Sequence, residues 1–222
     1  MQHFQPIAAA LLAAFLALAP AAASAQGQAP SSGAGEVVAF GDSLSAGYGV
    51  GPGESFPEQL QAALKAAGHD VTVANAGVSG DTSTGGLARL DWSVPDGTGL
   101  AILELGANDA LRGIAPEITE KNLDAMLTRL KERGIKVLLA GMKAPPNMGP
   151  DYAARFDPIF PRLAEKHGVP LYPFFLEGVA AERTLNQADA MHPNKDGVAV
   201  IVKGIVPGVI AALGKDGAVA AP

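Results

Sequence analysis

Residues 36–47 read EVVAFGDSLSAG, and this stretch decides the fold class. Its first part, Glu36–Phe40, is short and nearly continuous in apolar character, as expected for a strand that is covered on both faces. Later runs have the same character, and segments with helical spacing separate them. These further predicted strands are Val71–Asn75, Leu100–Leu105, Lys136–Ala140 and Pro170–Phe174. Because short apolar strands alternate with helices, the sequence predicts an α/β protein with a five-stranded parallel sheet.

Glycine and proline mark the ends of the predicted helices. Gly68, Gly134 and Gly168 each fall just after a helical segment and just before a strand, where a left-handed glycine commonly ends a helix. A final helix is predicted from about Asp196 to Leu213. We expect Pro207 to interrupt it, because proline lacks the backbone N–H and its ring clashes with the preceding turn. One domain is therefore predicted, over residues 36–213.

The N-terminal residues have the pattern of an export signal. Ile7–Ala19 is an apolar run of signal-peptide length, and Ala23-Ser24-Ala25 is a small-residue cleavage site. We therefore predict a signal peptide over residues 1–25 and a periplasmic or secreted protein, although no Lys or Arg precedes the apolar run. Residues 26–35 are predicted to be a flexible lead-in and residues 214–222 a flexible tail, because both lack hydrophobic periodicity.

Composition limits the partners of this chain. The formal net charge of −6 and the pI near 5.2 give no basic field for phosphate backbones, so no nucleic-acid partner is expected. The absence of cysteine excludes disulfides, thiolate metal sites and lipid attachment to a cysteine, so no stable membrane anchor is expected. The mature protein is expected to be a monomer.

Polar residues follow the predicted strands on one side of the sheet. Ser43 follows the first strand, Gly80 follows the second and Asn108 follows the third. Asp189 and His192 lie in a single turn just before the last helix. In open α/β sheets the ligand site lies outside the carboxyl ends of the strands, so these segments are expected to converge.

Together these residues supply what acyl transfer requires. Ser43 is the predicted nucleophile, His192 the general base and Asp189 the group that orients the base. The N–H of Ser43, the N–H of Gly80 and the side-chain amide of Asn108 are predicted to form the oxyanion hole. Two simpler interpretations stay open, in which Asp189 caps the following turn and Asn108 closes a turn. The chemistry needs no cofactor, and His192 with Asp189 alone makes a poor metal site.

These segments resemble the conserved blocks of the SGNH hydrolase superfamily, also called the GDSL esterases and lipases. The blocks read GDSLSAG from Gly41, AGVSGDTS from Ala76, GAND from Gly106 and DAMHPN from Asp189. The resemblance implies a three-layer α/β/α, flavodoxin-like fold and the same catalytic roles for the residues named above. Residues 141–179 resemble the branch that contains acyl-CoA thioesterases, lysophospholipases and arylesterases. This likeness implies a hydrolase of small-molecule acyl esters or thioesters, including lysophospholipids, that forms an acyl-serine intermediate.

A loop after the fourth strand is the predicted substrate-binding segment. Its apolar residues can line an acyl-chain groove, and an ordinary surface connection is the alternative. The predicted substrate-binding residues are Met142, Pro145, Pro146 and Met148. Trp92, Phe174 and Phe175 are instead predicted to pack in the core.

Two other functions remain open from the sequence. The same catalytic residues can serve a carbohydrate O-acetylesterase, whose substrate rim would be polar. A non-catalytic exported binding protein that keeps the fold is the second alternative.

Overall fold

The sheet of the computed structural model has the strand order β2-β1-β3-β4-β5, and every neighbouring pair is parallel. The structure describes Met1 and residues 36–214. Its strands are β1 (Glu36–Gly41), β2 (Thr72–Gly77), β3 (Leu100–Glu104), β4 (Lys136–Ala140) and β5 (Leu171–Tyr172). This order is flavodoxin-like, and its connections reverse direction between β1 and β3. The predicted five-stranded parallel α/β fold is therefore confirmed.

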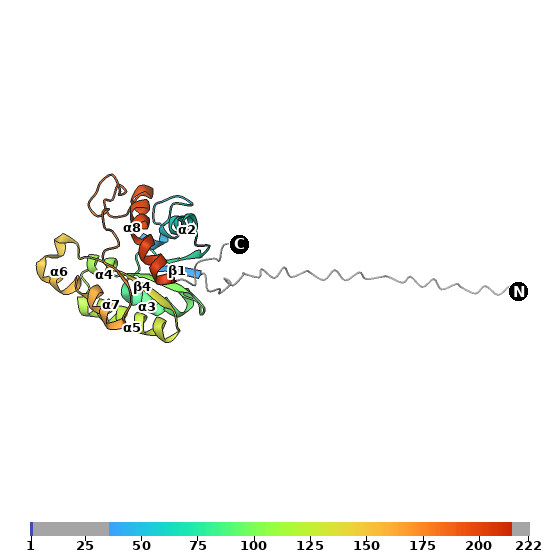
Figure 1. Ribbon diagram of the computed structural model, residues 1–222, viewed down its shortest axis with the longest axis horizontal. Coiled ribbons are helices and arrows are strands. Elements are labelled where there is room, and N and C mark those ends of the chain that lie inside the picture. The colour runs from blue at the N-terminus through green and yellow to red at the C-terminus, as the bar shows by residue number, and fades with distance from the viewer. Residues whose placement is uncertain (2–35, 215–222) are drawn as a thin grey trace. The chain divides into compact units, whose positions relative to one another are not determined.

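Helices cover both faces of the sheet and make the three layers (Figure 1). On one face α2 (Phe56–Ala66) packs against α8 (Lys195–Leu213). On the other face α5 (Pro116–Glu132) lies between α3 (Ser83–Ser93) and α7 (Ile159–His167). The shorter helices are α1 (Ser43–Ala46), α4 (Ala107–Leu111), the 3₁₀ turn η1 (Pro146–Met148) and α6 (Pro150–Phe156).

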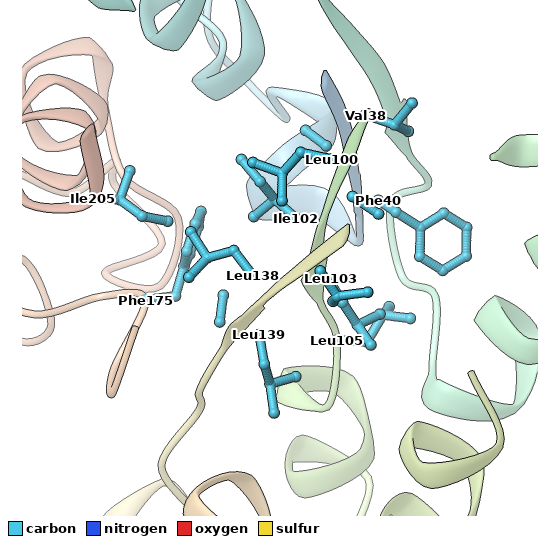
Figure 2. Packing of buried hydrophobic residues seen from close by; sticks show 14 of the residues in the cluster. Val38, Phe40, Leu100, Ile102, Leu103, Leu105, Leu138, Leu139, Phe175 and Ile205 are labelled. Atoms are coloured by element: carbon cyan, nitrogen blue, oxygen red, sulfur yellow. The ribbon is translucent and has the colours of Figure 1, made fainter. Parts of the chain in front are cut away.

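The core lies between the sheet and these two helical layers. Figure 2 shows Leu138 of β4 pointing toward Phe175 and Ile205, while Leu103 of β3 points to the other side. Phe175 is fully buried and meets Phe56 edge to face, with ring centroids 4.9 Å apart. The prediction that Phe175 packs in the core is therefore confirmed, and the central strands are covered on both faces as expected.

The three predicted helix-ending glycines have left-handed backbones. The φ angles are 87° at Gly68, 70° at Gly134 and 63° at Gly168. An L residue with a Cβ atom adopts this conformation only at a cost, so glycine sets where each helix ends. The sequence prediction for these boundaries is confirmed.

Pro207 does not interrupt the last helix, so that prediction is wrong. The helix α8 runs without a break from Lys195 to Leu213 with Pro207 inside it. Pro207 and Lys203, four residues earlier, are both exposed, so water can hydrate the carbonyl that loses its hydrogen bond. Among the described helices, α8 is the one whose length and mean hydropathy of 1.9 would allow it to cross a membrane. Its packing against α2, β4 and β5 identifies it as a core helix of this fold.

Two further expectations about packing need correction. Trp92 is 75% exposed, because the buried face of α3 is formed by Gly86, Arg89 and Leu90 and Trp92 points away from it. The strand β5 spans only two residues, because the regular ladder ends at Tyr172 and the next bond runs from the Phe175 N–H to the Gly141 carbonyl, at 2.8 Å. The predicted signal peptide over residues 1–25, the lead-in over 26–35 and the tail beyond Gly214 lie outside the described residues.

Candidate active site

The turn that carries Ser43 is built on the end of β1, at the point where the strand connections change direction. Gly41 ends the strand, and a Cβ atom there would collide with the Glu104 carboxylate and the Ser45 hydroxyl. Asp42 is the N-cap of α1, since its Oδ1 accepts a hydrogen bond of 3.0 Å from the Leu44 N–H. Ser43 is then the first residue of α1, where the backbone N–H has no partner within the helix.

Three of the predicted site residues form one hydrogen-bonded chain. The Nε2 atom of His192 lies 2.9 Å from Ser43 Oγ, and the Nδ1 atom lies 2.6 Å from Asp189 Oδ2. The second oxygen of Asp189 accepts hydrogen bonds from the N–H groups of Met191 and His192, at 2.9 and 3.0 Å. These bonds lower the pKa of Asp189 to about 2. The bond from the His192 N–H contributes most, and the bond from the His192 ring comes next. An ionised Asp189 can only accept, so Nδ1 carries the imidazole proton and Nε2 is left to accept from Ser43.

The predicted oxyanion donors surround the same turn. The loop after β2 is joined to the nucleophile turn by a hydrogen bond of 3.0 Å from the Val78 N–H to the Gly41 carbonyl. Gly80, in this loop, has a φ of +80°. Asn108, in the first turn of α4, donates from Nδ2 to Asp42 Oδ2 at 2.8 Å. Within residues 36–214, the N–H groups of Ser43 and Gly80 donate to no acceptor, so both are available to a ligand oxygen.

Two arginines that sequence reasoning missed hold this loop in place. Arg89 is buried and donates to the Gly41 and Ala76 carbonyls, each at 2.8 Å, and pairs with Asp81 at 2.7 Å. Arg112 donates from Nη2 to the Gly80 carbonyl at 2.6 Å. The sequence contained a signal for Arg89, which falls at helical spacing with Gly86 and Leu90 on one face of α3, because a buried charge must find partners. Arg112 is exposed and lies just after α4, so this signal does not apply to it.

A pair of buried carboxyl groups lies beneath the nucleophile turn. Glu104 Oε2 accepts from the Asp42 N–H at 3.2 Å and from the Ser45 hydroxyl at 2.8 Å. Burial raises the pKa of Asp42 to about 6, against the hydrogen bonds from Leu44 and Asn108 that lower it. Complete burial, and then the charge of Asp42, raise the pKa of Glu104 well above its ordinary value. Burial therefore favours the neutral form of Glu104, which its place at the end of an apolar strand alone did not reveal.

Glu104→Gln is expected to flatten the pH dependence of stability. The folded pKa of Glu104 is raised, so its contribution to stability is complete in acid and is lost as pH rises through the folded pKa. Glutamine keeps an acceptor for Asp42 and Ser45 but cannot ionise. Melting temperatures measured from pH 5 to 9 should fall less steeply with rising pH in Glu104→Gln than in the unmodified protein. Glu132→Gln, at an exposed position of α5, is the matched control, and equal slopes for all three proteins would contradict the assignment.

The predicted substrate-binding residues divide into two groups. Met142 is 2% exposed and packs in the core, so we remove it from the substrate-binding set. Pro145, Pro146 and Met148 lie on the surface loop at η1. The methyl group of Met148 lies beside Gly113, just after α4, so this loop adjoins the element that carries Asn108.

Four exposed apolar side chains close in sequence to the site residues were not predicted. Their exposed fractions are 54% for Tyr48, 44% for Val78, 43% for Leu111 and 47% for Met191. Each lies within five residues of Ser43, Gly80, Asn108 or His192. The Tyr48 ring also contacts the His192 ring, with centroids 4.6 Å apart. We call these four residues the apolar rim.

The described residues contain no group of three or more His, Asp or Glu side chains placed to hold a metal ion. The arrangement that they do contain is a serine, an oriented imidazole and several N–H donors at one place. It can activate a hydroxyl group for attack on a carbonyl carbon and stabilise the resulting oxyanion.

Comparisons with known proteins agree with this site. The model of the GDSL-like Lipase/Acylhydrolase family matches residues 39–200. An arylesterase of Vibrio mimicus is 42% identical over 165 residues, which cover 72% of this chain and 81% of that protein. Thioesterase 1/protease 1/lysophospholipase L1 of Escherichia coli (strain K12) is 40% identical over 158 residues, 71% of this chain and 74% of that protein. The crystal structure of TesA matches with a TM-score of 0.76 at 38% identity and covers 80% of this chain and 99% of that chain. The chain therefore belongs to the GDSL-like lipase/acylhydrolase family.

Proposed function

We propose that this protein is a serine hydrolase that cleaves carboxylic esters or acyl thioesters through an acyl-serine intermediate. The observation that carries the proposal is the chain of hydrogen bonds from Ser43 through His192 to Asp189, at 2.9 and 2.6 Å. Membership of the family and the names of the relatives, an arylesterase and a thioesterase/lysophospholipase, support the same reaction class.

The reaction proceeds in two balanced steps. In the first, Ser43 Oγ attacks the acyl carbon while its proton moves to Nε2 of His192, and the imidazolium then protonates the departing alcohol or thiol. In the second, water attacks the acyl-serine, His192 takes the proton of the water, and the proton returns to Ser43 as the acid leaves. The ionised Asp189 stabilises the imidazolium in both steps and holds the ring in its orientation.

Backbone and side-chain donors stabilise the oxyanion in this proposal. The N–H groups of Ser43 and Gly80 and one N–H of the Asn108 amide point their partial charge at the carbonyl oxygen as it becomes negative. The other N–H of the Asn108 amide is held by Asp42 at 2.8 Å, which fixes the amide before substrate arrives. Donors that are oriented in advance need no reorganisation in the transition state.

Asn108→Ala is expected to lower kcat by about 10²- to 10³-fold, the usual cost of one oxyanion donor. KM should change little, because the lost bond is made chiefly in the transition state. The readout is steady-state hydrolysis of p-nitrophenyl butyrate together with a melting curve, since Asp42 loses a partner as well. Asn147→Ala, at an exposed position in the η1 loop, is the control. A kcat within a few-fold of the unmodified protein would remove Asn108 from the oxyanion hole.

The apolar rim is the proposed contact surface for the substrate. Tyr48, Val78, Leu111 and Met191 expose apolar area close in sequence to the site residues, and Pro145, Pro146 and Met148 lie on the η1 loop that adjoins α4. Such a surface suits the acyl chain of an ester, a thioester or a lysophospholipid better than it suits a sugar. This observation favours the esterase and thioesterase reading over a carbohydrate O-acetylesterase.

Labelling with a fluorophosphonate probe tests the proposal directly. We expect one covalent adduct, located by mass spectrometry at Ser43 and absent from Ser43→Ala. Rates on p-nitrophenyl acetate, octanoyl thioester and acetylated xylan then identify the substrate class. No adduct and no turnover of any of these substrates would instead support a non-catalytic binding protein.

We also propose that the protein is exported, on the strength of the apolar run and the cleavage site in residues 1–25. Expression of the whole chain in a bacterial host should yield a protein in the periplasm or medium whose first residue is Gln26. N-terminal sequencing of that fraction provides the check. Recovery of the uncleaved chain in the cytoplasm alone would contradict export.

A further inference from the structure

The active site is assembled from two loops that lie far apart in the sequence. Ser43 and Tyr48 belong to the nucleophile loop after β1, and His192 belongs to the base loop before α8. In the series of hydrogen bonds that joins Ser43, His192 and Asp189, the two loops meet through the bond of 2.9 Å between His192 Nε2 and Ser43 Oγ. One hydrogen bond does not fix how two loops lie against each other, so other contacts must hold them in place.

Gln187 makes contacts to both loops. Its Nε2 donates to the Tyr48 carbonyl at 2.7 Å and to the Pro193 carbonyl at 2.9 Å, so both protons of the amide are used. Its backbone N–H donates to the His192 carbonyl at 2.8 Å. A single residue thus binds the carbonyls of His192 and Pro193 and ties them to the carbonyl of Tyr48.

Through Tyr48, the bonds of Gln187 also bear on the position of the His192 imidazole. The ring of Tyr48, whose carbonyl Gln187 holds, lies against the His192 ring at 4.6 Å between centroids. On the next residue, a Cβ atom at Gly49 would collide with Gln187 Oε1. The amide therefore lies between the two loops, with its nitrogen bonded to both and its oxygen close to Gly49.

We propose that Gln187 is a positioning residue for catalysis, which holds the base loop against the nucleophile loop and so sets the distance from His192 Nε2 to Ser43 Oγ. The inference rests on the proposed serine-hydrolase function. It assigns Gln187 a role distinct from that of Asp189, which orients the imidazole from within the base loop.

Gln187→Glu and Gln187→Ala test this role. Glutamate has the same shape but places an acceptor opposite the two carbonyls, and alanine removes the amide. We expect kcat to fall by about 10- to 100-fold in both variants, because displacement of reacting groups by about 1 Å costs that order of rate. KM should stay within about 3-fold, since Gln187 is not part of the apolar rim. The rate of fluorophosphonate labelling at Ser43 should fall in parallel with kcat.

Two measurements separate positioning from general loss of structure. The NMR signal of the His192 Nδ1 proton should be retained in Gln187→Glu, because its bond to Asp189 lies within the base loop. Gln61→Ala is the matched control, since Gln61 Oε1 accepts from the Val73 N–H of β2 at 2.7 Å and neither residue belongs to the nucleophile loop or the base loop. Gln61→Ala should change the melting temperature and leave kcat within about 3-fold.

A double-mutant cycle gives an independent test. Gly49→Ala pushes the amide of Gln187 away without removing it, and should lower kcat in the unmodified background. In the Gln187→Ala background the same change should lower kcat less, because the collision no longer exists and only the strain of an alanine at a φ of +73° remains. Additive effects would overturn the proposal, as would Gln187 variants with unchanged kcat or ones that all fail to fold. Absence of labelling in the unmodified protein would instead overturn the proposed function.

Discussion

Replacement of His192 by alanine is expected to lower kcat for ester hydrolysis by about 10⁴- to 10⁶-fold. Without the imidazole, the Ser43 hydroxyl has no acceptor for its proton, and the N–H donors alone supply only the residual rate. KM should change by much less, because the base acts in the chemical step. The measurement is single-turnover and steady-state hydrolysis of p-nitrophenyl butyrate, with labelling of Ser43 as a second readout.

His167→Ala is the matched control for this prediction. His167 pairs with Asp124 at 2.6 Å, the same distance that separates His192 from Asp189, but it lies at the end of α7 on the helical layer. We expect His167→Ala to lower the melting temperature and to leave kcat almost unchanged. If both histidine variants lost similar amounts of activity, or neither did, His192 would not be the base.

Asp189→Asn is expected to lower kcat by about 10³- to 10⁴-fold while the fold is kept. An amide N–H opposite Nδ1 favours the tautomer that carries its proton on Nε2, and that nitrogen can then no longer accept from Ser43. The check is kcat of the purified variant, together with NMR of the His192 ring to identify its tautomer. Asp124→Asn changes the other histidine pair in the same way and should leave kcat unchanged, whereas an active Asp189→Asn with the original tautomer would disprove the orienting role.

The same aspartate gives a weak acid dependence of stability. The folded pKa of Asp189, about 2, lies below its ordinary 3.8, so its contribution is complete above pH 3.8 and is lost as pH falls toward 2. Because the side chain is 39% exposed, solvent screens the pair with His192 and the effect is small. Asp189 therefore matters for the rate far more than for folding.

The two histidine pairs show what local geometry leaves undecided. Both pairs have a carboxylate at 2.6 Å from a ring nitrogen, and both lie near the end of a helix or turn. Only His192 has the hydroxyl of Ser43 at 2.9 Å from its second nitrogen. The tertiary structure, which brings the base loop to the end of β1, makes the difference between a structural pair and a candidate catalytic one.

Much of the fold could be predicted because the buried strands appear in the sequence as short runs of apolar residues. The runs that became β1, β3 and β4 are buried almost throughout, and the prediction placed them within a residue of their bounds. The wrong predictions concern residues whose burial depends on which other elements pack against them. Trp92 is apolar yet faces solvent, and α8 passes through Pro207 because that side of the helix is exposed.

By itself, the sequence determined the parallel sheet, the alternation of strands and helices along the chain, and the placing of Ser43, Gly80 and Asn108 after successive strands. These follow from periodicity and from the rule that ligand sites lie beyond the carboxyl ends of parallel strands. Only the tertiary structure decided how Glu104, Arg89 and Gln187 support those residues, because each acts on backbone groups distant in the chain. Such contacts produce no periodic pattern in the sequence, because a buried polar group forms its hydrogen bonds with the groups that the fold places beside it.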